Sequence, residues 1–250
     1  MNAPHSPSLL AGVQMAARDP ILGLTEAFNA DKNPKKVNLG VGVYTGDDGK
    51  VPLLECVRRA ERQLVEQPAA RNYLPIDGLA AYDKVVQGLV FGADSPALKE
   101  GRIVTVQSLG GTGGLRVGAD LLHRIAPDAT LWISDPSWEN HRAVFESAGF
   151  NVNAYPYYDA NARGIDFKGM LGALKAVPAG DIVLLHACCH NPTGVDLSEA
   201  QWTGVVETIG ARGLVPFLDL AYQGFGDGLD AEHRNLVSVR RAAGLGQVAC

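Results

Sequence analysis

The chain has 250 residues, of which 46% are hydrophobic and 20% charged, and its formal net charge is −5 at pH 7. This composition is typical of a globular protein that buries a sizeable core, and it excludes an intrinsically disordered chain. The acidic balance argues against nucleic acid as the main partner, and no apolar stretch reaches the roughly 20 residues of a membrane span.

The N-terminal stretch 1–17 lacks a basic start followed by an apolar core, so we expect no signal peptide and a cytoplasmic protein. The spacing of the cysteines fits neither a zinc site nor a disulfide framework. A metal ligand or a nucleophile in the run Cys188-Cys189-His190 stays open, but a buried cysteine usually behaves as a small hydrophobic residue. We therefore expect no metal. The cysteines are Cys56, Cys188, Cys189 and Cys250.

The first hundred residues carry mainly helical signals. Asp19-Pro20 has the chemistry of a helix N-cap and first helical position. Gly40 and Gly42 would allow the backbone to approach a ligand closely, and residues 72–78 have the composition of a loop. The predicted helices span residues 21–30, 53–66 and 79–91.

From residue 102 onward, strand and helix patterns alternate. Such alternation predicts a parallel sheet with helices on both faces. The predicted strands are 103–107, 130–134, 152–155, 182–186 and 214–218, and a further strand opens at 247–250. The predicted helices are 113–125, 141–148, 167–176, 198–211 with Ser198 as N-cap, and 237–243.

The chain is organised around the stretch Phe217 to Phe225. An apolar run ends there in Asp219, and Tyr222 follows three residues later. Open α/β sheets bind ligands at the carboxyl ends of their strands, so Asp219 is well placed to pair with a cationic ring nitrogen. The alternative is an aspartate that ends the strand and caps a turn.

The glycine-rich stretch from Ser108 to Gly114 lies between a predicted strand and a helix. Its backbone N–H groups and the helix dipole would hold a phosphate. Asp135, at the end of the next strand, favours a nicotinamide site as a rival, but Arg116 stands where the dinucleotide fingerprint requires its third glycine. A tight turn without any ligand is a further interpretation.

Two other strand ends carry polar or aromatic side chains. Trp138 could stack on a flat ring, and Asn191 could donate a hydrogen bond. The alternatives are a core aromatic and a plain Asn-Pro turn, while His141 could be a surface or core histidine. A phosphate loop, a stacking aromatic, an amide donor and an acid with a tyrosine together suit a phosphorylated aromatic cation.

Several motifs in order carry a resemblance to a known family. The chain resembles the class I aspartate and aromatic-amino-acid aminotransferases, which are pyridoxal phosphate (PLP) enzymes of fold type I, over nearly its whole length. The resemblance implies a three-layer α/β/α fold with a mainly parallel sheet that is incomplete at its C-terminus. It implies an arm and part of a small domain in residues 1–48 and the PLP-binding large domain in residues 49–250. The matching motifs span residues 38–44, 72–78, 110–114, 135–141, 188–194 and 219–226.

The resemblance assigns a role to each strand-end residue. Asp219 would keep the pyridine nitrogen protonated, and His141 would support Asp219 from behind. Tyr222 and Asn191 would hydrogen-bond the phenolic oxygen of the cofactor, and Trp138 would stack on its ring.

The remaining roles that the resemblance implies concern the phosphate and the substrate. Gly111 and Thr112 would bind the phosphate, and Tyr73 would reach the phosphate of a partner subunit's cofactor in a homodimer. Gly42 would line the site near the carboxylate of the substrate. Trp138 and Asn191 would also contact the substrate. In this family cis peptide bonds precede the prolines that match Pro136 and Pro192.

The chain departs from the family at the lysine that joins the cofactor. In the family this lysine stands shortly after a region like residues 247–250, and none of the lysines here matches its motif. We therefore expect a fragment that is inactive by itself. Because the antiparallel partner of strand 103–107 would also be missing, we expect it to aggregate. The lysines are Lys32, Lys35, Lys36, Lys50, Lys84, Lys99, Lys168 and Lys175.

Three functional hypotheses follow from the sequence. The first is transfer of the amino group of an aromatic amino acid or aspartate to 2-oxoglutarate, in the intact parent enzyme. The second is another PLP reaction on the same scaffold, such as β-elimination or decarboxylation. The third is a non-catalytic remnant that binds PLP or a nucleotide. The choice between aspartate and aromatic substrates stays open.

Overall fold

The computed structural model describes residues 11–14, 20–37, 43–44, 46–226 and 228–229. The chain divides into two compact units, Met1–Asn72 and Tyr73–Cys250. The domains expected from the resemblance, 1–48 and 49–250, stay a prediction. Among the described residues, no helix has the length and apolar character needed to cross a membrane.

The described residues of the first unit form two helices, and none of those whose burial is known is buried. Helix α1 spans Pro20–Ala30 and α2 spans Glu55–Glu66, close to the predicted bounds. None of the residues of α2 is buried. Glu55 pairs with Arg58 at 2.6 Å and with Arg59 at 3.1 Å on its exposed surface. Exposed pairs of this kind stabilise a helix only slightly.

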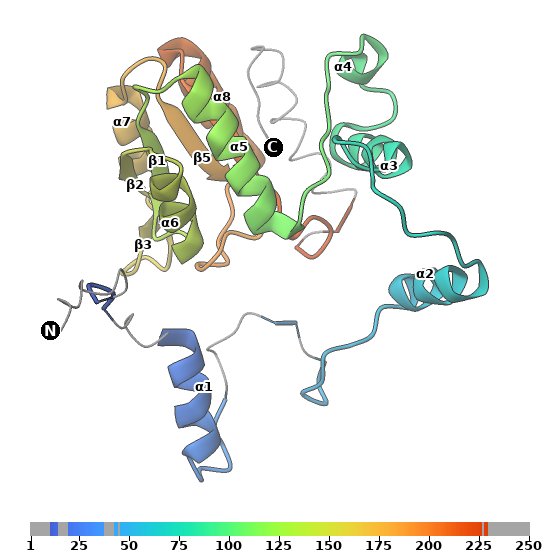
Figure 1. Ribbon diagram of the computed structural model, residues 1–250. Coiled ribbons are helices and arrows are strands. Elements are labelled where there is room, and N and C mark those ends of the chain that lie inside the picture. The colour runs from blue at the N-terminus through green and yellow to red at the C-terminus, as the bar shows by residue number, and fades with distance from the viewer. Residues whose placement is uncertain (1–10, 15–19, 38–42, 45, 227, 230–250) are drawn as a thin grey trace, which may run out of the picture. The chain divides into compact units, whose positions relative to one another are not determined.

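The second unit is built on a four-stranded parallel sheet (Figure 1). The strands lie in the order β2-β1-β5-β6. β1 pairs with β2 on one side and with β5 on the other, and β5 also pairs with β6. The predicted parallel sheet is therefore confirmed. The strands are β1 (Leu131–Asp135), β2 (Val152–Pro156), β5 (Ile182–His186) and β6 (Val215–Asp219).

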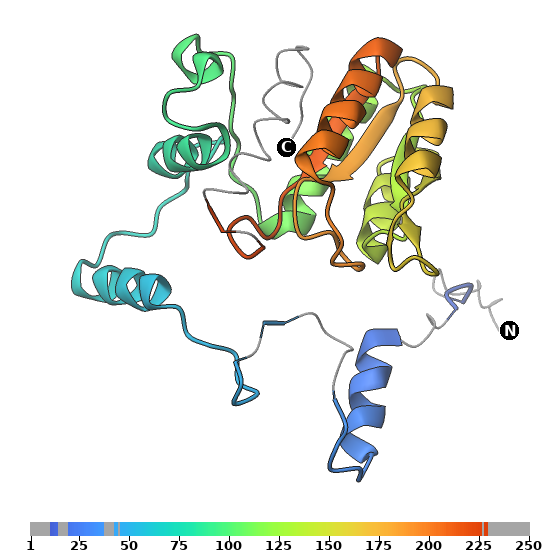
Figure 2. The ribbon, with the colours of Figure 1, turned by 180° about the vertical axis from the view of Figure 1, so that it is seen from behind.

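Helices cover both faces of this sheet. Ile182 and Leu184 of β5 belong to one apolar cluster with α5 and α6, whereas Val183 and Leu185 belong to another with α7 and α8. The two views from opposite sides show α5 in front of the sheet in one and α8 in front in the other (Figures 1 and 2). A strand covered on both faces is apolar along most of its length, and the first four residues of β5 are all apolar. The helices are α5 (Gly110–Ile125), α6 (Glu139–Ser147), α7 (Phe167–Ala176) and α8 (Glu199–Arg212).

Local side-chain chemistry fixes the ends of these elements. The Ser198 hydroxyl accepts from the backbone of Gln201 at 3.3 Å, and the backbone of Ser198 donates to the Gln201 side chain at 2.8 Å. Ser198 is therefore the N-cap of α8, as predicted, within a capping box, and left-handed Gly213 (φ 64°) ends the helix. Just before β5 begins, the Asp181 carboxylate accepts from Thr130 N at 3.0 Å and from Trp132 Nε1 at 2.9 Å. These two hydrogen bonds tie the start of β5 to β1.

Two expectations for the glycine-rich region are wrong. Residues 103–107 do not form a strand, because no neighbouring strand among the described residues offers them a hydrogen-bonding ladder; Gln107 N donates instead to Asp77 O at 2.8 Å. The stretch Gly110 to Gly114 is not a loop, since α5 already begins at Gly110. Its amides therefore belong to the first turn of a helix.

Other elements complete the comparison with the prediction. Helix α3 (Ala80–Phe91) is confirmed. Helix α4 (Pro96–Lys99) and the antiparallel pair β3 (Tyr158–Asp159) and β4 (Gly164–Ile165) were not predicted, because such short elements carry almost no periodicity. The helix predicted at 237–243 and the strand predicted at 247–250 lie outside the described residues.

Candidate active site

The carboxyl ends of three parallel strands lie along one edge of the sheet. Asp135, His186 and Asp219 are the last residues of β1, β5 and β6. Helix α5 packs on β6 closely, since a Cβ on Gly118 would lie 2.9 Å from the Phe217 ring. Both views show the first turn of α5 at the same edge, beside the chain that follows β6 (Figures 1 and 2). The first turn of α5 and Asp219 therefore share one edge of the sheet.

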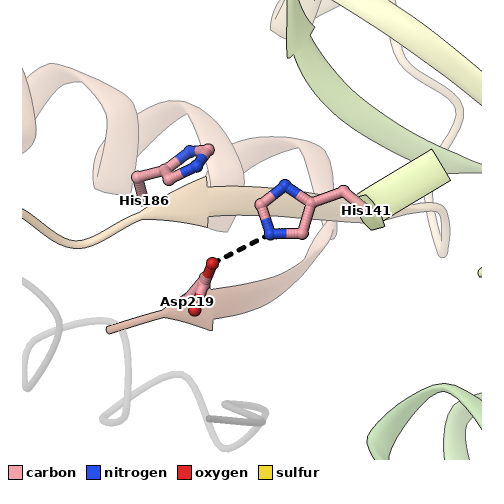
Figure 3. Close-up of side chains that lie close together, drawn as sticks. All are labelled: His141, His186 and Asp219. Atoms are coloured by element: carbon pink, nitrogen blue, oxygen red, sulfur yellow. Dashed lines mark hydrogen bonds and ion pairs between the residues drawn. The ribbon is translucent and has the colours of Figure 1, made fainter. Parts of the chain in front are cut away.

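A hydrogen-bonded pair forms the centre of this edge (Figure 3). The Nε2–H group of His141 donates to Asp219 Oδ2 at 2.8 Å, and the other ring nitrogen lies 2.8 Å from the hydroxyl of Ser137. The His141 side chain is fully buried, whereas 20% of the Asp219 side chain is exposed. The carboxylate therefore faces outward from the strand end while the histidine supports it from the interior.

The surroundings of Asp219 keep its carboxyl group ionised. Burial raises its pKa, but the hydrogen bond from His141 and the charges of His141 and His186 outweigh burial, so the pKa is lowered. The backbone of Leu220 adds to the lowering. Asp219 is thus a fixed negative charge at a strand end, which suits a cationic partner.

His186 is a member of this cluster that the sequence did not single out. Its ring lies 5.0 Å from the ring of His141, centroid to centroid. Both ring nitrogens are buried without a hydrogen-bond partner in the described structure. Burial, together with the charges of nearby His190 and His141, lowers the pKa of His186 to about 3. The available signal was the apolar run of β5, which ends in His186 as β6 ends in Asp219.

The atoms of this cluster are also spaced for a metal ion. His141, His186 and Asp219 each offer a ligand atom, and these atoms lie within 4.8 Å of one another (Figure 3). However, His141 and Asp219 already satisfy each other through their hydrogen bond. The geometry is that of a carboxylate held by a histidine.

Trp138 and Asn191 stand at the ends of neighbouring strands. Trp138 is the N-cap residue of α6, and its partly buried ring meets His141 edge-on at 5.3 Å. Asn191 is partly buried in the connection between β5 and α8. Cis peptide bonds precede Pro136 and Pro192, as the resemblance implies.

The other predicted site residues lie in more exposed places. Gly111 and Thr112 are exposed in the first turn of α5, where backbone N–H groups lack partners within the helix. Tyr222 is 40% exposed and Tyr73 is 98% exposed. The carbonyl oxygen of Tyr222 lies 3.7 Å from the sulfur of Cys189. Gly42 lies outside the described residues, and the roles assigned to all of these residues stay predictions.

Comparison with known proteins gives a single family. The family described as aminotransferase class I and II matches residues 34–245. The aspartate aminotransferase of Pseudomonas aeruginosa is 59% identical over 225 residues, which are 90% of this chain and 56% of that protein. The aromatic-amino-acid aminotransferase of Escherichia coli is 51% identical over 221 residues, which are 88% of this chain and 56% of that protein.

Solved structures agree with these matches. The aromatic-amino-acid aminotransferase of Burkholderia pseudomallei, covalently bound to pyridoxal phosphate, is 60% identical with a TM-score of 0.91. The match covers 96% of this chain and 60% of that one. The chain therefore spans little more than half the length of the relatives that it matches.

Proposed function

We propose, from the premise that this chain belongs to the class I and II aminotransferase family, that the whole protein transfers an amino group from aspartate or an aromatic amino acid to 2-oxoglutarate with PLP. Relatives named for both kinds of substrate support this range of donors. The observation that carries the proposal is the ionised carboxylate of Asp219, held by His141 at the carboxyl end of β6.

The residues at this edge suit PLP. When bound, PLP supplies an electron-withdrawing ring that weakens the bonds at the α-carbon of an amino acid. Asp219 would hold a proton on the pyridine nitrogen, because its own carboxyl group stays ionised. The first turn of α5, with Gly111 and Thr112, would receive the phosphate through its backbone N–H groups.

The remaining predicted residues would orient the cofactor and the substrate. Trp138 would stack on the cofactor ring and exclude water from one face of it. Asn191 and Tyr222 would hydrogen-bond its phenolic oxygen. Tyr73 would reach across to the site of a second subunit, which makes the whole protein a homodimer in this proposal, and Gly42 would lie near the substrate carboxylate.

The 250-residue chain does not transfer amino groups by itself in this proposal. Two of its lysines, Lys168 and Lys175, lie on α7, and Lys84 and Lys99 lie on α3 and α4. The other four lie in the first unit. None matches the motif of the lysine that joins the cofactor in the family, so PLP would be held without a covalent bond.

The test uses the purified chain and PLP. We expect the absorbance of PLP to change on binding, and we expect borohydride reduction to leave no pyridoxyl group on any one lysine. Amino transfer from aspartate or tyrosine to 2-oxoglutarate should be undetectable with the chain and present with the full-length protein. An adduct at one lysine together with amino transfer by the chain would contradict its inactivity. β-Elimination or decarboxylation by the full-length protein, in place of transfer, would contradict the proposed reaction.

A further inference from the structure

The connection between β5 and α8, residues 187–198, is folded around the ring of His190. This side chain is only 2% exposed. Its Nε2 lies 2.9 Å from the hydroxyl of Ser134 on β1, and its Nδ1 lies 2.8 Å from the hydroxyl of Thr193. The ring stacks on Tyr157 with centroids 3.9 Å apart and planes 10° apart. Every face and both nitrogens of His190 are therefore in contact with the protein.

The backbone of this connection is tied down on both sides of Asn191. Asp196 accepts from the backbone N–H groups of Cys189 at 2.7 Å and of His190 at 2.8 Å. The N–H group of Gly194 donates to the carbonyl of His190 at 2.7 Å. The ring of His190 also bonds to Thr193, so it bridges the residues that flank Asn191 and Pro192.

Ser134 anchors the ring of His190 to the sheet. Ser134 is only 2% exposed on β1, and its hydroxyl lies 2.9 Å from Nε2 of His190. The ring is thus attached to the sheet at one nitrogen and to its own connection, through Thr193, at the other.

Thr193 links the ring to the rest of the connection. Its hydroxyl accepts from Val195 N at 3.2 Å and lies 2.8 Å from Nδ1 of His190. Burial and the charge of His141 together lower the pKa of His190 to about 4, so the ring is neutral near neutral pH. A neutral imidazole has one donor and one acceptor nitrogen, and each of them meets a hydroxyl here.

We propose that His190 is the positioning residue for Asn191: its ring, bonded to Ser134 in the sheet and to Thr193 in the connection, holds the connection in the shape that places the Asn191 amide. The positioning role stands on these contacts alone. Only the consequence for cofactor binding rests on the proposed function.

The first arm of the test needs no cofactor. The readout is the side-chain amide signal of Asn191 in the chain labelled with ¹⁵N. His190→Phe keeps the stacking ring and removes both nitrogens, so the side-chain amide signal of Asn191 should move or broaden. His123→Phe is the matched control, since His123 packs on Phe150 in a different part of the unit and should leave that signal unchanged. An unmoved Asn191 signal in His190→Phe would overturn the proposal.

The second arm measures PLP affinity in a double-mutant cycle. We expect His190→Phe and Asn191→Ala each to weaken binding by up to about tenfold, the scale of one hydrogen bond. The double variant should bind no more weakly than Asn191→Ala, because both changes remove the same interaction. Effects that multiply would show that His190 does not act through Asn191. If the unaltered chain does not bind PLP, the proposed cofactor role fails, and the first arm alone decides the role of His190. If His190→Phe does not fold, Thr193→Val takes its place in both arms, because it removes the hydroxyl group that contacts Nδ1 of His190.

Discussion

At the scale of single residues, Asp219 and the histidines behind it set the charge of the sheet edge. Asp219 is ionised because His141 and His186 outweigh the effect of its burial on the pKa. His186 and His190 stay neutral because burial lowers their pKa values.

Replacement of Asp219 tests its role directly. Asp219→Ala in the full-length protein should lower kcat by about 10²–10³-fold or more, as the loss of other fixed electrostatic groups does. The cause would be a pyridine nitrogen that is no longer held protonated. Asp128→Ala, in an exposed turn after α5, is the control and should leave kcat unchanged. Unchanged turnover in Asp219→Ala would remove Asp219 from the mechanism.

The two neutral histidines should make the fold sensitive to acid. Their folded pKa values of about 3 for His186 and about 4 for His190 lie below the ~6.5 of an unfolded histidine. Between these values the unfolded chain binds more protons, so the free energy of unfolding falls as the pH drops through this window. Asp219, whose pKa is also lowered, stabilises the fold above its unfolded pKa of ~3.9, and this contribution is lost only at still lower pH.

Urea unfolding at different pH values measures this effect. We expect the free energy of unfolding to decrease by on the order of a few kcal/mol between about pH 7 and about pH 4.5. His186→Phe lacks one of the titrating groups and should show a smaller decrease. The same decrease in the variant and in the unaltered chain would contradict the assignment to His186.

At the scale of elements, close packing of helices on the sheet limits which residues are tolerated. Gly118 of α5 lies against the ring of Phe217, which is 2% exposed and also meets Phe145 edge-on at 5.3 Å. Gly172 of α7 has open space where a Cβ would be. Because both glycines are inside helices, they share the same cost in backbone entropy. They differ only in how closely other side chains pack against them.

These two glycines form a matched pair of substitutions. Gly172→Ala should raise the free energy of unfolding by about 0.5–1 kcal/mol through helix propensity. Gly118→Ala gains the same stabilisation from helix propensity, but it forces the added methyl group against Phe217. Such overpacking costs about 1–3 kcal/mol. We therefore expect a net loss of stability in Gly118→Ala, measured by urea unfolding. Equal stabilisation by both substitutions would show that α5 does not pack tightly on β6.

At the scale of the whole molecule, the two units differ in how much they bury. None of the residues of α2 is buried, and exposure extends from residue 51 to residue 77. In the second unit, the strands and helices bury two apolar clusters on opposite faces of the sheet. The stretch 51–77 should therefore open to solvent far more readily than the sheet.

Limited proteolysis with trypsin tests this difference. The earliest cuts should follow the exposed arginines of α2 and Arg71, since no core holds this stretch closed. Arg142 and Arg212, whose side chains donate to the carbonyls of Val152 and Val177, should be cut later. Mass spectrometry identifies the products, and first cuts at Arg142 or Arg212 would contradict the prediction.

The sequence by itself determined the elements of the sheet and the residues that end them. Short apolar runs predicted β5 and β6, because a strand covered on both faces is apolar along most of its length. The alternation of strand and helix patterns predicted β1 and β2 as further strands. The sequence also predicted Ser198 as the N-cap of α8, since the contacts of such a cap lie within four residues of one another. The motifs from residue 34 to residue 245 are sufficient to place the chain in its family.

Only the tertiary structure decided which side chains meet at the edge. Ser134 and His190 are 56 residues apart in sequence, and His141 and Asp219 are 78 residues apart. Their contacts exist because β5 inserts between β1 and β6 in the sheet, an order that hydrophobic periodicity does not encode. The same reason explains the error at 103–107, because a β-strand requires hydrogen bonds to a neighbour and a local pattern cannot show whether that neighbour is there.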